Sequence, residues 1–65
     1  MCKYPDVTVQ LSGNDGNAFY ILGAVKRAMR EAEVSEEEID QCMTEMKSGD
    51  YRNLLGVAHD WVNVL

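Results

Sequence analysis

A turn rich in Gly, Asn and Asp leads straight into a strong helical pattern, and this junction constrains the fold of the chain most. The turn runs from Ser12 to Asn17. After it, apolar side chains recur at helical spacing: Ala18, Ile21, Leu22, Val25, Ala28, Met29 and Ala32. Spacing of this kind places apolar side chains along one side of a helix. We therefore predict a helix over residues 18–32. The pair Asp15-Gly16 also suits a hairpin turn, which would make residues 18–22 a strand, but the longer helical period decides against it.

The N-terminal segment has the pattern of a half-buried strand. Val7, Val9 and Leu11 alternate with polar residues, and Pro5 suits the strand entrance, where a missing amide hydrogen is harmless. The C-terminal residues 62–64 are either a frayed helix end or a second short strand. Because a lone strand leaves its backbone unpaired, we expect residues 7–11 to pair with residues 62–64, and pairing with a second copy in a homodimer is the alternative.

Two further helices are marked by their caps. Ser35 and Glu38 fit a capping box, with Val34 and Ile39 at the flanking staple positions. An apolar face follows at Ile39, Cys42, Met43 and Met46. Gly49 suits a left-handed helix stop, and Asp50 suits the cap of a third helix. The apolar stripe of that helix is Tyr51, Leu54, Leu55, Ala58 and Val62. The expected fold class is therefore α+β, with an N-terminal strand, three helices and a short C-terminal strand, in one domain over residues 1–65.

Length and composition restrict the stability, the redox state and the compartment that we expect for this chain. A chain of 65 residues builds a core that stabilises it by only about 3–5 kcal/mol. Cys2 and Cys42 belong to no CxxC pair and have no histidine at metal-ligand spacing, which favours reduced thiols over a disulfide. No apolar run is long enough for a bilayer span or a signal peptide, so we expect a cytoplasmic protein that does not associate with membranes. We also expect no bound cofactor.

The net charge of −5 is unevenly distributed. The acids concentrate in residues 31–50, whereas residues 1–30 carry an excess of cations. Only three basic residues cluster, which argues against nucleic acid as a partner. They are Lys26, Arg27 and Arg30. Glu36, Glu37, Glu38 and Asp40 are interpreted as a solvated helix start that complements the helix dipole.

Several of these features together resemble a family of short uncharacterised bacterial and phage proteins. The resemblance covers nearly the whole chain and rests on the GNDGNAF loop of residues 13–19, the basic helix that follows, the SGDY turn of residues 48–51 and the late Trp61. It implies a compact domain and carries no catalytic residue over to this chain.

Three places are candidates for function. The loop Gly13, Asn14, Asp15, Gly16 and Asn17 could present amide hydrogens to an anion at a helix start, although a structural turn and helix cap is the favoured interpretation. His59 and Asp60 are adjacent on a helix and do not face each other, so no acid–base pair is predicted. The third candidate is a docking surface of Tyr20, Lys26, Arg27 and Arg30 beside Gly23.

For that surface a structural interpretation is equally open. Gly23 could simply allow close packing inside the protein, with the cations paired to Glu31 and the acidic second helix. The leading function hypothesis is a noncatalytic protein-interaction or regulatory module, phage- or mobile-element-related if the resemblance holds, with an unidentified protein partner. It would use the docking surface or the acidic residues 36–40. A small-ligand or anion-binding domain is the alternative, and a DNA binder resembling a helix-turn-helix is the weaker one. No enzyme is predicted, because nucleophile, base and orienting group do not assemble.

Overall fold

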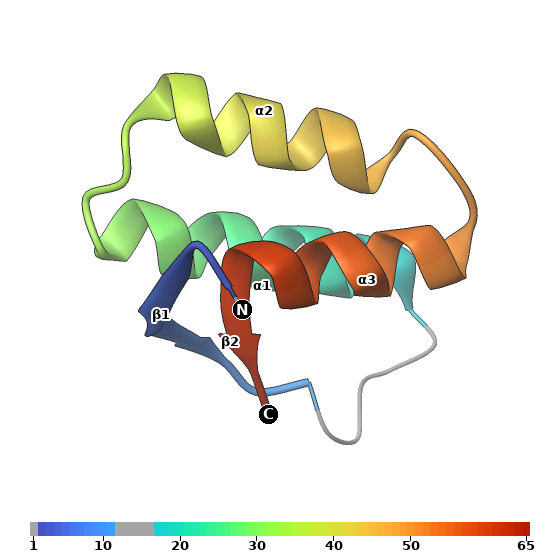
Figure 1. The fold of residues 1–65 in the computed structure, drawn as a ribbon, viewed down its shortest axis with the longest axis horizontal. Helices are drawn as coiled ribbons and strands as arrows, with labels where there is room; N and C mark the ends of the chain where they lie inside the picture. Colours follow the sequence, from blue (N-terminus) through green and yellow to red (C-terminus); the bar gives the residue numbers. More distant parts are fainter. Residues whose placement is uncertain (1, 12–16) are drawn as a thin grey trace.

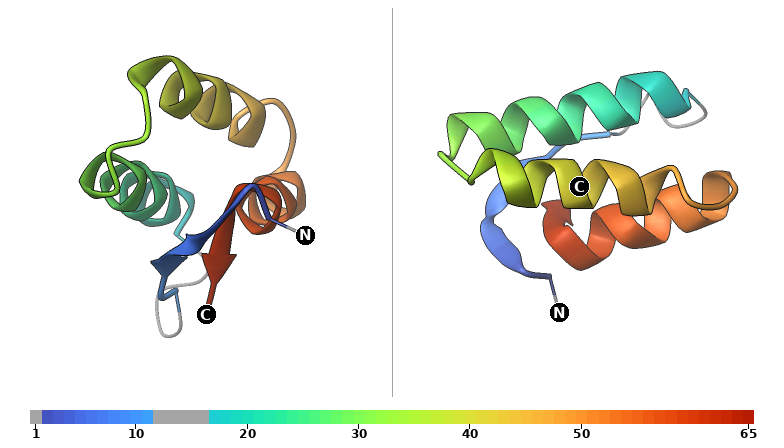
Figure 2. Two further views of the ribbon diagram at one scale, coloured as in Figure 1. Left: turned by 60° about the vertical axis from the view of Figure 1, so that its left-hand side comes forward. Right: turned by 90° about the horizontal axis from the view of Figure 1, so that it is seen from above.

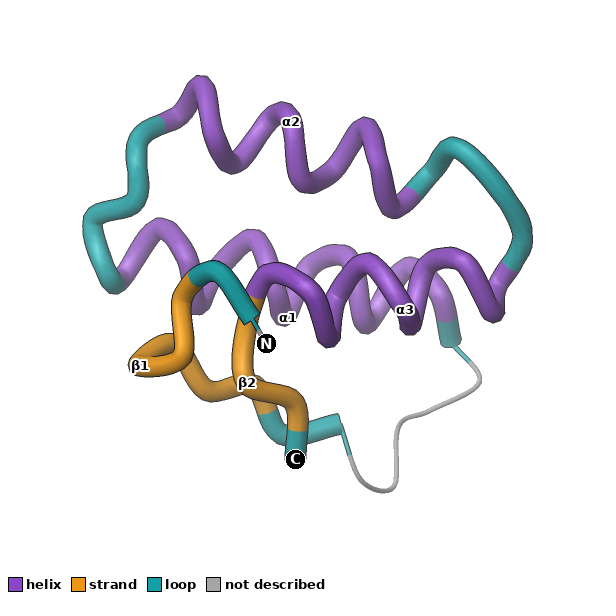
Figure 3. Tube along the Cα trace, viewed as in Figure 1, coloured by secondary structure: helices purple, strands orange, loops and turns teal. Residues whose placement is uncertain are grey.

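The computed structural model describes residues 2–11 and 17–65 and shows the expected α+β order along the chain. The strand β1 spans Tyr4–Val9, the helices α1, α2 and α3 span Ala18–Glu31, Glu36–Met46 and Tyr51–Trp61, and the strand β2 spans Val62–Val64 (Figure 1). Because residues 18–22 are helical, the alternative strand over them is wrong. Helix α3 passes into β2 without an intervening loop (Figure 3).

The elements pack around one core. Helix α2 lies across α1 and α3, and the two strands lie on the opposite side of these helices, with β1 against α1 and β2 against α3 (Figure 2). The most deeply buried large side chains are Ile21, Val25, Met29, Ile39, Cys42, Met46 and Val62. The apolar stripes predicted for the helices therefore face the core, except that Ala32 is exposed and that Val62 is buried from β2 instead of from the third helix. Trp61, which the predicted stripe of the third helix omits, is also buried.

The two strands pair in parallel, which confirms the expected pairing of the terminal segments within one chain. Tyr4 lies opposite Val62 and Val9 opposite Val64, and the register shifts between Tyr4 and Thr8. This irregularity contains Pro5, so the missing proline donor interrupts no regular ladder.

The bounds of β1 differ from the predicted 7–11. The strand starts at Tyr4, which pairs with Val62, and ends at Val9, which pairs with Val64. Leu11 nevertheless stays buried, and its amide donates to the Leu65 carbonyl at 3.1 Å. The alternating apolar positions were therefore assigned correctly to the core side.

Each helix begins at a side-chain cap. Ser35 Oγ accepts a hydrogen bond from the Glu38 amide at 3.3 Å, and Asp50 Oδ1 accepts one from the Asn53 amide at 2.9 Å. Both predicted caps are thus confirmed. The capping box is only half formed, because the Glu38 carboxylate binds Tyr4 and Lys3 instead of reaching back to Ser35.

The ends of α1 and α2 differ from the ends predicted from the sequence. Gly49 lacks the predicted positive φ, and its small size matters instead, because an added Cβ would lie 2.9 Å from the Asn53 Cβ. Among the described residues other than glycine, the left-handed one is Glu33, with a φ of 63°. It ends α1 in a Schellman motif, in which Glu33 N donates to Arg30 O and Val34 N to Met29 O, each at 3.0 Å. Ala32, predicted on the apolar stripe, is the exposed C-cap residue.

Candidate functional site

The outward side of α1 combines aromatic and basic side chains, and we call it the α1 face. It consists of Phe19, Tyr20, Gly23, Lys26, Arg27 and Arg30, all of them exposed. Phe19 exposes 87% of its surface and Tyr20 exposes 41%. Large apolar side chains gathered at the surface of a soluble protein mark interaction sites more often than isolated ones do. The structure therefore brings the four residues predicted for a docking surface onto one exposed helix face.

Sequence reasoning missed Phe19 as a member of this face. Phe19 precedes Gly23 by four residues, so the two lie on the same side of the helix. That spacing could have placed Phe19 on the α1 face, but an apolar residue is expected in the core. The structure also shows that Gly23 serves no close packing within the described chain, because a Cβ added there would meet nothing within 4 Å.

The cations of the α1 face differ in their surroundings. Arg30 Nη2 donates to Glu36 Oε1 at 3.3 Å, and both side chains are largely exposed. An exposed pair of this kind contributes little to stability. Among the described residues, Lys26 and Arg27 have no ion pair. These two cations are thus free to meet an external group.

The candidate anion-binding loop lies almost wholly outside the described residues, since only Asn17 of that set is described. Asn17 Oδ1 accepts a hydrogen bond from the Tyr20 amide at 3.1 Å and caps α1. This oxygen therefore already fills a structural role, as the turn-and-cap interpretation expects.

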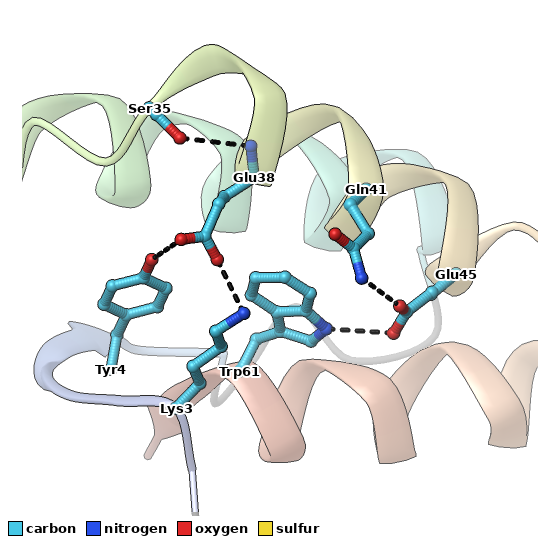
Figure 4. Close-up of polar contacts among 7 residues, drawn as sticks. All are labelled: Lys3, Tyr4, Ser35, Glu38, Gln41, Glu45 and Trp61. Carbon is cyan, nitrogen blue, oxygen red and sulfur yellow. Dashed lines mark hydrogen bonds and ion pairs between the residues drawn. The ribbon is translucent and has the colours of Figure 1, made fainter.

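A polar network joins the N-terminal segment to α2 and α3 (Figure 4). Tyr4 Oη donates to Glu38 Oε2 at 2.7 Å, and Lys3 Nζ lies 2.6 Å from Glu38 Oε1. The second contact is an ion pair, because Oε1 is buried and accepts no well-aligned hydrogen bond from the described residues. Glu38, interpreted from the sequence as part of a solvated helix start, is therefore an attachment point for β1.

Trp61 extends the network towards the end of α2. Its ring stacks on Tyr4 at a centroid distance of 6.2 Å, and Lys3 Nζ lies 4.5 Å from its centroid. Its indole Nε1 donates to Glu45 Oε1 at 3.1 Å, while Gln41 donates to the other carboxylate oxygen. The buried Trp61 thus satisfies its polar atom while it packs against the N-terminal segment.

These contacts shift the ionisation of the groups involved. The Lys3 ammonium and the Tyr4 hydroxyl hold the pKa of Glu38 below its usual value, and Glu38 in turn raises the pKa of Lys3 and of Tyr4. The bond from Trp61, followed by that from Gln41, lowers the pKa of Glu45. All of these shifts favour the charge states that hold the network together, which fits a structural role.

A hollow of about 480 Å³ lies between the irregular part of β1 and the connection from α1 to α2. Its walls include Pro5, Val7 and Val34, with Lys3 and Glu38 at one end. The charges at that end neutralise each other in the ion pair, and the remaining wall is a mixture of apolar and acidic residues. The hollow therefore presents no convergent set of ligand-binding groups.

Cys42 and His59 are two described side chains with catalytic potential, and their surroundings differ. Burial raises the pKa of the Cys42 thiol to about 12, which leaves it protonated and unreactive at neutral pH. His59 is exposed on α3. Within residues 2–11 and 17–65, no three His, Cys, Asp or Glu side chains come close enough to hold a metal ion. Over the same residues, no helix combines the length and apolar character needed to cross a membrane.

Comparison with family models, curated proteins and solved structures gave no match to this chain. Among the described residues, the α1 face is the strongest indication of function.

Proposed function

We propose that the protein is a noncatalytic protein-interaction module and that the α1 face is its docking surface. The observation that carries this proposal is the exposure of Phe19 at 87%, next to Tyr20 and in line with three cations. A phenylalanine in water costs free energy that burial against a partner would recover. Aromatic residues and arginine are also the side chains that contribute most at protein interfaces.

The charge of the face indicates the kind of partner. Lys26 and Arg27 are unpaired among the described residues, although the chain as a whole has a net charge of −5. A local positive surface on an acidic protein steers an acidic group of a partner towards that surface. We therefore expect the partner to present carboxylates around an apolar spot that accepts Phe19.

The other hypotheses have less support. Asn17 of the anion-binding loop is engaged as a helix cap. Helices α2 and α3 run side by side in opposite directions (Figures 1 and 2), whereas the helices of a helix-turn-helix cross at a steep angle. Of the acidic residues 36–40, Glu36 pairs with Arg30 and Glu38 with Lys3, which leaves Glu37 and Asp40 as the acids of that end without an ion pair to the described residues.

The test is a capture experiment from lysate of the native host, with a charge reversal on the α1 face and a matched reversal elsewhere. The double variant Arg27→Glu/Arg30→Glu should lose the specifically captured protein, because two of the three cations become repulsive. The control Lys47→Glu/Arg52→Glu makes the same change in net charge at exposed positions off the α1 face and should keep it.

Both variants should retain the helical circular dichroism spectrum and nearly the wild-type melting temperature, because exposed ion pairs contribute only about 0–1 kcal/mol. If both variants capture the protein as wild type does, the α1 face is not the docking surface. If the α1 variant unfolds, Arg27 and Arg30 have a structural role and the proposal is wrong.

A further inference from the structure

Gly23 is unfavourable for the helix that contains it and has no use within the described chain. It lies in the interior of α1, where glycine is about 1 kcal/mol less favourable than alanine. No positive φ requires it, and an added Cβ would meet no atom within 4 Å. A glycine on an exposed helix face allows the backbone of another element to approach closely. No described element of this chain uses the clearance.

The residues around Gly23 are arranged so that the face complements itself. The aromatic side chains Phe19 and Tyr20 lie in the turn before Gly23, and Lys26 and Arg27 lie in the turn after it. At about 100° per residue, Phe19 and Lys26 fall on one flank of Gly23, whereas Tyr20 and Arg27 fall on the other.

In an antiparallel pair of α1 helices, the aromatic residues of one copy lie beside the cations of the other copy. A two-fold axis at Gly23 relates the two helices of such a pair. Each flank of one helix then lies beside the same flank of the other helix, and the two chains run in opposite directions. Tyr20 and Lys26 lie about 4.5 Å from Gly23 along the helix axis, and Phe19 and Arg27 lie about 6 Å from it, so the residues that face each other on one flank differ by only about 1.5 Å in height. Tyr20 then faces Arg27 of the other copy, and Phe19 faces Lys26. A cation over an aromatic ring is a favourable contact, and it shields both rings from water.

We propose that the α1 face also binds a second copy of this chain, as an antiparallel helix pair that crosses at Gly23. This inference rests on the proposed function, because it takes the α1 face to be the docking surface and names one occupant of it. The cations of one copy lie on the opposite side of the two-fold axis from the cations of the other copy. Their separation is comparable to the screening length at physiological salt, so salt screens their mutual repulsion. Since both occupants cover the same residues, self-association and binding of the acidic partner exclude each other.

The test uses two glycines with the same local environment. Gly56 lies in α3, is exposed like Gly23, and also has nothing within 4 Å of an added Cβ. Gly23→Gln and Gly56→Gln therefore both fit the monomer, and both should raise its melting temperature at low concentration, because glutamine favours the helix more than glycine does. Only the side chain at residue 23 blocks the close approach of a second α1.

Sedimentation equilibrium from micromolar to millimolar protein measures the association. Wild type and Gly56→Gln are expected to form a reversible dimer with the same dissociation constant, whereas Gly23→Gln should raise this constant at least about tenfold. On dilution, the wild-type amide signals that shift should belong to residues 19–30. Phe19→Ala should weaken the dimer as well, since it removes one ring from each copy.

Three results would overturn the inference. The first is a wild-type chain that stays monomeric at millimolar concentration, and the second is a Gly23→Gln variant that dimerises like wild type. The third is a set of dilution shifts confined to residues 62–65, which would assign the dimer to strand pairing. A monomeric chain whose partner capture still depends on Arg27 and Arg30 would overturn only the self-association and would leave the proposed function standing.

Discussion

Replacing Glu33 by glycine is expected to stabilise the protein, because Glu33 has a backbone conformation that suits glycine. Its φ of 63° lies in the left-handed region. This region costs a residue with a Cβ roughly 1–2 kcal/mol. Glycine adopts it freely but loses more chain entropy on folding, at about 0.5–1 kcal/mol. The free energy of unfolding should therefore rise in Glu33→Gly by roughly 0.75 kcal/mol, the difference between the midpoints of these two ranges.

The structure shows that Glu33→Gly removes no polar contact between residue 33 and the other described residues. The Glu33 side chain is exposed and makes no hydrogen bond or ion pair with the described residues. The two backbone hydrogen bonds of the Schellman motif start from the amides of Glu33 and Val34, and both amides remain in Glu33→Gly. The backbone conformation of residue 33 is therefore the main quantity that changes.

The measurement is reversible thermal and urea unfolding followed by circular dichroism. For a domain of this size, the expected gain corresponds to a melting temperature about 2–8 °C higher. Glu33→Ala is the matched control, because it removes the same negative charge but keeps a Cβ, so it should not gain stability from the backbone. Equal stabilisation by glycine and alanine would refute the reasoning, since the effect would then come from the charge.

Three further predictions concern the cap of α2, the ion pair of β1 and the thiols. Ser35→Ala should lower the free energy of unfolding by about 0.5–2 kcal/mol, and an unchanged urea midpoint and slope would argue against the cap. The lowered pKa of Glu38 means that its contribution to stability is present above its usual value of 4.5 and is lost as the pH falls through the folded value. Urea unfolding as a function of pH should therefore show a smaller acid-side loss in Glu38→Gln than in wild type. The raised pKa of Lys3 has the opposite sign, so its contribution is complete below 10.5 and is lost at higher pH. Finally, neither a chelator nor a reductant should change the circular dichroism spectrum, because Cys42 is buried as a free thiol, and loss of helical signal with either reagent would contradict this.

The sequence alone determined the elements whose causes are local. Helix periodicity places Val25 and Met29 in the core whatever their neighbours are, because residues three or four apart share one side of a helix. The caps at Ser35 and Asp50 are equally local, since each side chain binds an amide three residues along the chain. The sequence could also place Tyr20 and Arg27 on one exposed face for the same reason.

Only the tertiary structure decided the features that depend on distant residues. The Glu38 carboxylate had a local role available in the capping box, and Tyr4 and Lys3 attract it away because the parallel pairing of β1 with β2 brings them to α2. The exposure of Phe19 and the clearance at Gly23 depend on where the other helices and strands pack, which periodicity does not specify. A left-handed stop occurs after α1 at Glu33, where the chain turns into α2 and packing overrides the local preference for glycine, whereas Gly49 after α2 has no positive φ.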